Sequence, residues 1–203
     1  MNETKKTKAD KPVIRKVWIE KAVDDTPDTS YLGEYANKPA SPWSIDRKAR
    51  GDQEHGEFRY WNPSSNHCPP GEGESWSHVS DEDVRVALTV AGLAPCADRL
   101  DAITRLDLHY VEQDYKRMES YNHGDWCYLG FIAKAEVQLR RNGVIQVVHS
   151  GGLWGIESDS GDDYFDEVKK EQLAELAQEL RLMGFGERAV KYACDHAEEK
   201  ETF

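Results

Sequence analysis

The stretch CYLGFIAKAEVQLRRNGVIQVVHS, residues 127–150, decides the fold. Apolar or small residues occupy nearly every second position from Cys127 to Leu139, and Lys, Glu and Gln alternate with them near the end. This period of two predicts a β-strand that is buried on one face. Asn142-Gly143 favours the two-residue turn of a β-hairpin, so Val144–Ser150 is the expected return strand.

The predicted turn also fixes which residues face each other, because the numbers of paired residues must then sum to 285. Ala135 would face Ser150 and Ala133 would face Gly152, which makes the middle of the buried face small. We interpret these small side chains as room for a closely packed helix. A ligand groove at the same place is the alternative.

On the opposite face of the hairpin, the same register places Glu136 across from His149. A carboxylate can orient an imidazole for catalysis. The simpler interpretation is a half-exposed ion pair across two strands, which contributes about 0.2–1 kcal/mol. We favour the ion pair.

Outside the hairpin, several segments have apolar residues three or four positions apart, which predicts helices. The first follows Ser80, whose hydroxyl and the nearby Asp83 match a capping box. The others are expected within 97–121, at Tyr164–Met183 and at Glu187–Glu199. Within 97–121, the alternation of leucine and tyrosine at 106–110 leaves a short strand as an alternative.

The remaining segments predict strands and loops. Val13–Glu20 alternates imperfectly and is expected to be a strand, and Glu57–Trp61 a short one. Asp24–Asp46 contains several prolines and is expected to be an ordered loop. Asn62–Ser77 is rich in Pro, Gly and Ser and is expected to be a surface loop.

Strands and helices are segregated along the chain, with no repeated βαβ unit, so we predict the α+β class. The expected architecture is a small, mainly antiparallel sheet centred on a hairpin at 126–154, with helices packed on one face. A flexible segment at 1–11 would precede a single domain over 12–200, which carries a loop and helical insertion at about 64–105.

Composition restricts the possible functions. The chain has 203 residues, with 26 Lys and Arg against 38 Asp and Glu, and a formal net charge of −12. Direct nucleic-acid binding is not expected, because phosphate contacts need Lys and Arg. The sequence contains no run of about 20 apolar residues, so we predict no membrane span. The start of the sequence lacks a secretory signal, and the four cysteines are widely spaced, so a cytoplasmic protein with reduced thiols is expected.

Two groups of side chains raise the question of a metal ion. Carboxylates gather in the segment from Glu157 to Asp163, and oxygen ligands suit Ca²⁺ or Mg²⁺. The segment does not follow the EF-hand pattern, and acidic residues also stabilise the start of the helix that follows. His55, His67, Cys68 and His78 lack the regular spacing of zinc ligands.

The common catalytic motifs are also missing from the sequence. GGLWG at 151–155 is not a phosphate-binding loop, and neither GxSxG nor HExxH occurs. We therefore assign no catalytic, cofactor-binding or metal-binding residue.

The string GVIQ at 143–146, followed by SGGLWGIESDS at 150–160 and DEVKKEQLAELAQELRLMGF at 166–185, resembles a family of small acidic proteins carried by bacteriophages and plasmids. DTSYLGEY, FRYWNP and QDYKRMESYNHGDW fit the same family. The resemblance extends from about Val13 to Phe185, with 64–105 as an insertion. It implies a mobile genetic element inside a bacterial host, and it transfers no activity and no catalytic residue.

Charge and resemblance together predict a non-enzymatic interaction protein. It would bind a host, defence or element-encoded protein that has a basic surface and handles nucleic acid, and so modulate or inhibit that protein. Residues 151–203 contain 14 acidic and 6 basic residues, which points to this part of the chain. The candidate surface is Trp154, Glu157, Asp159, Asp162, Asp163, Asp166 and Glu167.

Two alternatives stay open at this point. One is a metal-dependent hydrolase that uses the acidic segment at 157–163. The other is a structural component of a phage or plasmid, which would self-associate instead of binding a foreign partner.

Overall fold

The computed structural model describes residues 12–52, 57–64, 76, 78–139 and 143–202. The chain is α+β, as predicted, and it divides into two compact units. Unit 1 comprises Met1–Pro27 and Trp126–Phe203, and unit 2 comprises Asp28–Asp125. We expected one domain with an insertion at about 64–105. The segment between the two parts of unit 1 is longer than that insertion and forms the whole of unit 2. The expected flexible segment at 1–11 lies outside the described residues.

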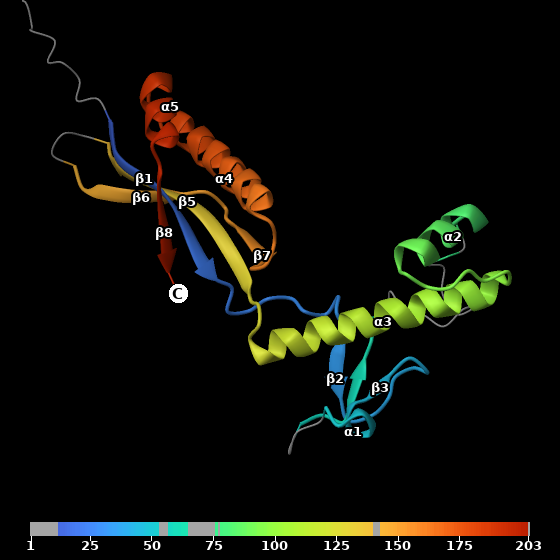
Figure 1. Ribbon diagram of the computed structural model, residues 1–203. Coiled ribbons are helices and arrows are strands. Elements are labelled where there is room, and N and C mark those ends of the chain that lie inside the picture. Colours follow the sequence, from blue (N-terminus) through green and yellow to red (C-terminus); the bar gives the residue numbers. More distant parts are fainter. Residues whose placement is uncertain (1–11, 53–56, 65–75, 77, 140–142, 203) are drawn as a thin grey trace, which may run out of the picture. The chain divides into compact units, whose positions relative to one another are not determined.

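Unit 1 is built on a mainly antiparallel sheet with helices on one face (Figure 1). Its strands are β1 (Val13–Val23), β5 (Tyr128–Gln138), β6 (Ile145–His149), β7 (Leu153–Glu157) and β8 (Glu198–Thr202). The strand order is β6-β5-β1-β8, and β7 pairs with the start of β5. The pairing of β8 with β1 is parallel. Helices α4 (Asp162–Leu182) and α5 (Glu187–Asp195) cover one face, here called the core face, and the other is called the open face.

The odd-numbered residues of β5 form the centre of the core. Phe131, Ala133, Ala135 and Val137 have no exposed surface and pack in one cluster with residues of α4 such as Leu176. The small residues in the middle of this strand thus lie under a closely packed helix, as the sequence suggested.

A buried hydrogen-bond network joins α4 to the sheet. The hydroxyl of Ser150 donates to Oε1 of Gln172 at 2.7 Å and accepts the N–H of Ala133 at 3.0 Å. The N–H of Gly152 donates to the same Gln172 oxygen at 3.1 Å. Because buried polar groups destabilise a fold unless they are paired, this network fixes the helix at one place above the strand.

The predicted hairpin forms, but its register differs from the prediction by two residues. His149 faces Lys134, so the numbers of paired residues sum to 283 and not to 285. Glu136 faces Val147, and the predicted Glu136–His149 pair is therefore wrong. The last pair before the connection is Gln138 with Ile145, and Asn142 of the predicted turn lies outside the described residues. A shift of two keeps every side chain on its predicted face.

Two further segments differ from the prediction. The terminal helix was expected to reach Glu199, but α5 ends at Asp195 and strand β8 follows. The backbone groups of β8 pair with β1, which compensates for a sequence, EEKET, that contains no apolar residue. Asp24–Asp46, expected as a loop, contains two short strands of unit 2.

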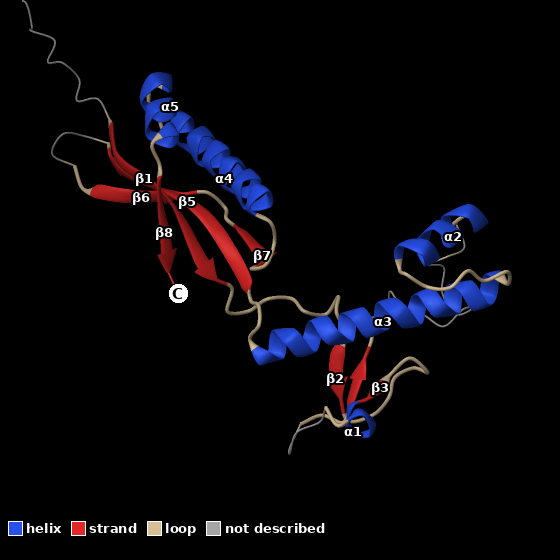
Figure 2. Ribbon diagram, in the orientation of Figure 1, coloured by secondary structure: helices blue, strands red, loops and turns tan. Residues whose placement is uncertain are grey.

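Unit 2 is organised around one long helix (Figure 2). Its elements are β2 (Glu34–Ala36), β3 (Ile45–Asp46), α1 (Arg47–Arg50), β4 (Tyr60–Asn62), α2 (Asp81–Val90) and α3 (Arg99–His123). The three strands form an antiparallel sheet in the order β2-β4-β3. Helix α3 is continuous through 106–110, so the alternative of a strand there is wrong.

Two small clusters hold the elements of unit 2 on α3. Val84 and Leu88 of α2 pack against Leu106, and α2 begins at the predicted cap, where the Ser80 hydroxyl accepts the N–H of Asp83 at 3.2 Å. Farther along α3, Tyr115 contacts the fully buried Trp61 of β4, with ring centroids 5.5 Å apart.

No helix among the described residues is long and apolar enough to cross a membrane.

Candidate functional site

The structure separates the predicted interaction residues into two groups. Trp154 and Glu157 belong to β7 and lie on the open face, since the Trp154 ring covers Gly130 and Glu157 pairs with Tyr128. The exposed Asp159 is in the turn that follows β7. Asp162, Asp163, Asp166 and Glu167 are exposed on the first two turns of α4, the helix that covers the opposite face. A single surface that combines Trp154 with all of the acidic residues is therefore not present.

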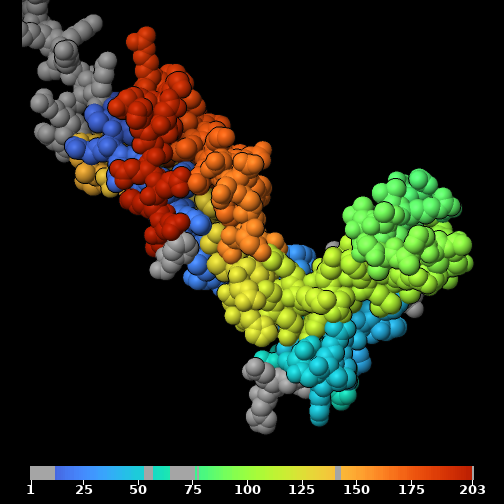
Figure 3. All heavy atoms as spheres, viewed as in Figure 1, coloured from blue at the N-terminus to red at the C-terminus, as the bar shows by residue number. Residues whose placement is uncertain are grey.

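Helix α4 extends the acidic group well beyond the predicted residues. Its solvent side carries five exposed carboxylates, each four positions after the last: Asp163, Glu167, Glu171, Glu175 and Glu179. Residues four apart are neighbours on a helix surface, about 6 Å apart along the axis, so the row is about 24 Å long, and it winds around the helix by about 40° at each step. We call this row the acidic ridge. Figure 3 shows α4, in orange, at the surface of unit 1.

The carboxylates of the acidic ridge are not neutralised by the described part of the chain. None of the five forms an ion pair with a described Lys or Arg side chain; Glu175 accepts the N–H of Gly151 at 2.8 Å. In contrast, Lys169 on another side of α4 pairs with Asp166 and Glu199. Like charges four apart destabilise a helix by about 0.2–0.5 kcal/mol per pair, so the ridge costs about 1–2 kcal/mol.

The described carboxylates do not converge on a metal ion. No group of three or more His, Cys, Asp or Glu side chains within the described residues has an arrangement that could hold one. The hydrolase that would use residues 157–163 gains no support from the geometry of that segment. Three of the four residues considered for zinc, His55, His67 and Cys68, lie outside the described residues.

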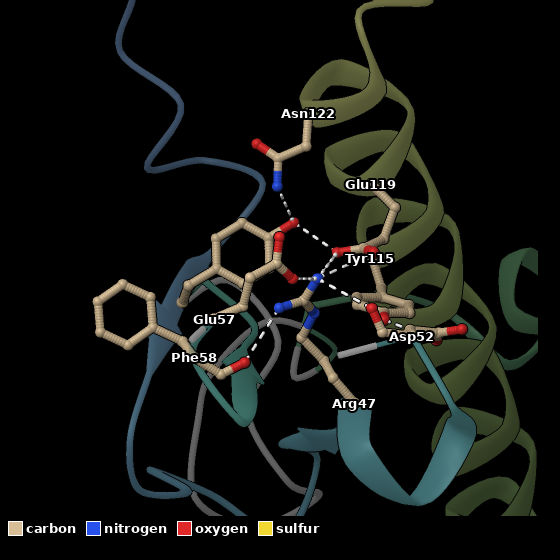
Figure 4. Close-up of polar contacts among 8 residues, drawn as sticks. Arg47, Asp52, Glu57, Phe58, Tyr115, Glu119 and Asn122 are labelled. Atoms are coloured by element: carbon tan, nitrogen blue, oxygen red, sulfur yellow. Dashed lines mark hydrogen bonds and ion pairs between the residues drawn. The ribbon is translucent and has the colours of Figure 1, made fainter. Parts of the chain in front are cut away.

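Unit 2 contains a buried ionic network that was not predicted from the sequence (Figure 4). Arg47, the first residue of α1, is 3% exposed. Its guanidinium donates to the carbonyl oxygen of Phe58 at 3.0 Å and to the carboxylates of Glu57 at 2.9 Å and Glu119 at 3.2 Å. The sequence around it, IDRKAR, has the composition of an exposed segment. The acceptors are 10 to 72 positions away, so no local pattern could reveal them.

Two tyrosines complete this network. Tyr35 donates to Glu119 at 2.6 Å and accepts from Asn122 at 2.7 Å, and the Arg47 guanidinium lies 4.6 Å from the centre of its ring. Tyr115 donates to Asp52 at 2.7 Å. Because Arg47 already contacts two carboxylates, it is neutralised from within the protein, and the network joins α1, β2 and α3 instead of offering a free cation to a ligand.

An open groove beside this network has mixed charge. Its lining residues are Arg50, Asp52, Glu112, Tyr115, Lys116, Glu119 and His123. Arg50 and Lys116 both pair with Glu112, at 2.7 and 3.5 Å. The cations of the groove are thus matched by its own carboxylates, and the groove favours neither an anionic nor a cationic ligand.

The network makes unit 2 sensitive to alkaline pH. Burial, and then the hydrogen bond to Glu119, raise the pKa of Tyr35 well above the usual value of about 10. Burial and the bond to Asp52 raise the pKa of Tyr115 in the same direction. The folded state keeps these protons where the unfolded state releases them, so their contribution to stability is complete below about pH 10 and is lost as the pH rises further.

We expect this loss to be visible in a tyrosine titration. Absorbance at 295 nm should show a cooperative ionisation step above about pH 10 that coincides with unfolding of unit 2. The Tyr35→Phe/Tyr115→Phe variant should lack the part of this step that belongs to the two phenols. Gradual ionisation of all nine tyrosines, without a step, would contradict the expectation.

Comparison with known proteins adds no relative: neither a family model, nor a curated protein, nor a solved structure matches the chain.

Proposed function

We propose that the chain is a non-enzymatic inhibitor carried by a mobile genetic element. In this proposal the acidic ridge of α4 occupies the basic surface with which a host or element-encoded protein holds nucleic acid. The mobile-element setting comes from the sequence resemblance alone. The inhibition comes from charge, since a protein that covers those Lys and Arg side chains excludes the nucleic acid that needs them.

The observation that carries the proposal is the regular, unneutralised row of carboxylates on α4. A row about 24 Å long at intervals of about 6 Å can contact several cations along an extended basic groove at once. The repulsion between these carboxylates destabilises the helix, and a cation that binds to the row relieves it. The net charge of −12 would also accelerate encounter with a basic partner and make the association strongly dependent on salt.

The proposal can be tested on a pool of basic proteins. Proteins that a heparin column retains from a bacterial lysate are bound to a fluorescent DNA duplex, and the full-length chain is added at low and at high salt. We expect the chain to displace the DNA at low salt and to displace none at high salt. In Glu167→Gln/Glu171→Gln/Glu179→Gln, three contacts of about 0.5 kcal/mol each disappear, so about tenfold more protein is needed.

A matched variant separates the ridge from total charge. This control, Glu34→Gln/Glu82→Gln/Glu136→Gln, removes the same number of negative charges outside the ridge. Two of the positions are in unit 2 and one is on the open face of unit 1. We expect this variant to displace the DNA as well as the unaltered chain does. Equal weakening in both variants would assign the effect to overall charge, and the absence of any displacement at low salt would refute the proposed function.

A further inference from the structure

On the open face of unit 1, a large aromatic side chain remains exposed. Trp154 of β7 is 44% exposed, and one side of its indole lies directly on Gly130 of β5. A Cβ atom added at Gly130 would be 2.1 Å from the indole Cε3, so this contact requires glycine. The ring is thus supported from below by backbone, and its exposed surface is available to another molecule.

The backbone around Trp154 is shaped to hold the ring there. The pairing of β7 with β5 shifts register between Leu129 and Phe131, as in a β-bulge. Gly152 and Gly155, two positions before and one after the tryptophan, have φ angles of +79° and +76°. Bulges commonly redirect a side chain near a functional site, and here the result is an exposed tryptophan rather than a buried one.

A carboxylate lies next to the backbone of this tryptophan. Oδ2 of Asp24 accepts the N–H of Gly155, the residue after Trp154, at 3.2 Å. Asp24 follows β1, and β5 lies between β1 and β7, so this side chain reaches across β5 near Gly130. An indole and a carboxylate together attract a cation: the ring through its electron-rich face, the carboxylate through its charge.

The same face already contains a comparable pair inside the protein. The ammonium of Lys200 on β8 lies 4.0 Å from the centre of the Trp18 ring, and Trp18 is only 6% exposed. Glu20, two residues along β1, has its pKa lowered first by a hydrogen bond from Lys134 and to a smaller extent by Lys200. One tryptophan of the open face is therefore covered by a cation of the chain, while no described Lys or Arg side chain covers Trp154.

From this contrast we propose that Trp154 and Asp24 receive an arginine side chain of a partner protein. Arginine fits better than lysine because its planar guanidinium can stack on an indole while its N–H groups bond a carboxylate in the ring plane. Each Asp24 oxygen accepts one backbone N–H, of Thr26 or of Gly155, and keeps a further lone pair for a donor. Tryptophan and arginine are also the residue types most enriched at the centres of protein interfaces.

This inference does not rest on the acidic ridge, which lies on the other side of the sheet. It adds a second contact surface with its own chemistry.

The test uses the full-length chain and a defined peptide. The side-chain N–H signals of the six tryptophans are recorded in a ¹⁵N-labelled sample, and Trp154→Phe identifies the signal of Trp154. A glycine-rich peptide with one arginine is titrated to millimolar concentration. We expect a saturable shift of the Trp154 signal, about two- to fivefold weaker binding for the lysine peptide, and no shift for the glutamine peptide.

A conservative variant tests the carboxylate. Asp24→Asn keeps an oxygen for the N–H of Gly155 and removes the charge, so we expect about two- to fivefold weaker binding of the arginine peptide, with the other five tryptophan signals unchanged. Equal responses to the arginine and glutamine peptides, or equal affinity in Asp24→Asn, would overturn the proposal. Glu167→Gln/Glu171→Gln/Glu179→Gln should keep the Trp154 response. Loss of the response in that variant would place the peptide on the ridge and would also overturn it.

Discussion

Replacing Arg47 with methionine is expected to destabilise unit 2 by about 3 kcal/mol. Methionine keeps much of the volume of the side chain but removes the charge, which leaves Glu119 in a largely buried position without its cation. Breaking a buried pair from one side is far more damaging than losing a surface pair. Amide hydrogen exchange in the middle of α3 should accelerate by about 100-fold under conditions where exchange reports the free energy of opening.

Arg50 provides the matched control, because it lies on the same short helix and also pairs with a glutamate of α3. Both side chains of the Arg50–Glu112 pair are more than one third exposed, at 40% and 34%. Such a pair contributes about 1 kcal/mol or less, so Arg50→Met should change exchange in α3 by less than about fivefold. If the two substitutions have the same effect, Arg47 does not have the structural role that we assign to it.

The second large effect is expected in unit 1, where Phe131→Ala should cost about 3–5 kcal/mol. Phe131 is fully buried on the core face, and its ring centroid is 5.5 Å from that of Phe165 on α4. The substitution removes apolar contacts and leaves a cavity that the surrounding structure fills only in part. The measurement is the free energy of opening of the β5 amides by hydrogen exchange.

Val147→Ala is the control for this substitution. Val147 lies on the open face of the same sheet and is 54% exposed, so the expected change is within about 0.5 kcal/mol. A large effect at Val147 together with a small one at Phe131 would mean that the two faces of the sheet have been assigned the wrong way round.

Periodicity was sufficient to predict which face of β5 is buried, but not how the hairpin pairs. The predicted and observed registers differ by two, and both place Phe131 and Val137 on the core face. Since side chains alternate with a period of two, burial cannot distinguish these registers. Only the turn could distinguish them, and the observed register is not the one that a two-residue turn at Asn142-Gly143 requires.

The missed features depend on residues far apart in the sequence. Arg47 is buried because Glu57 and Glu119 converge on it from another loop and from α3. Strand β8 forms because β1, 180 positions earlier, offers a free edge. Within the candidate surfaces, Trp154 and the start of the acidic ridge were predicted from the sequence. Asp24 was not predicted, because its bond to Gly155, the residue after Trp154, follows from the order of the strands.

The pairing of β1 with β5 affects how the chain folds during its synthesis on the ribosome. Ile19 of β1 pairs with Ala133, so more than one hundred residues are translated between the two partners. At about 5–20 residues per second, β1 waits roughly 5–20 s for its first neighbour, and all of unit 2 is made during that delay. The apolar side chains of β1 that are buried in the folded chain, Val17, Trp18 and Ile19, stay exposed during this delay. We therefore expect a chaperone that binds nascent chains to bind at this strand.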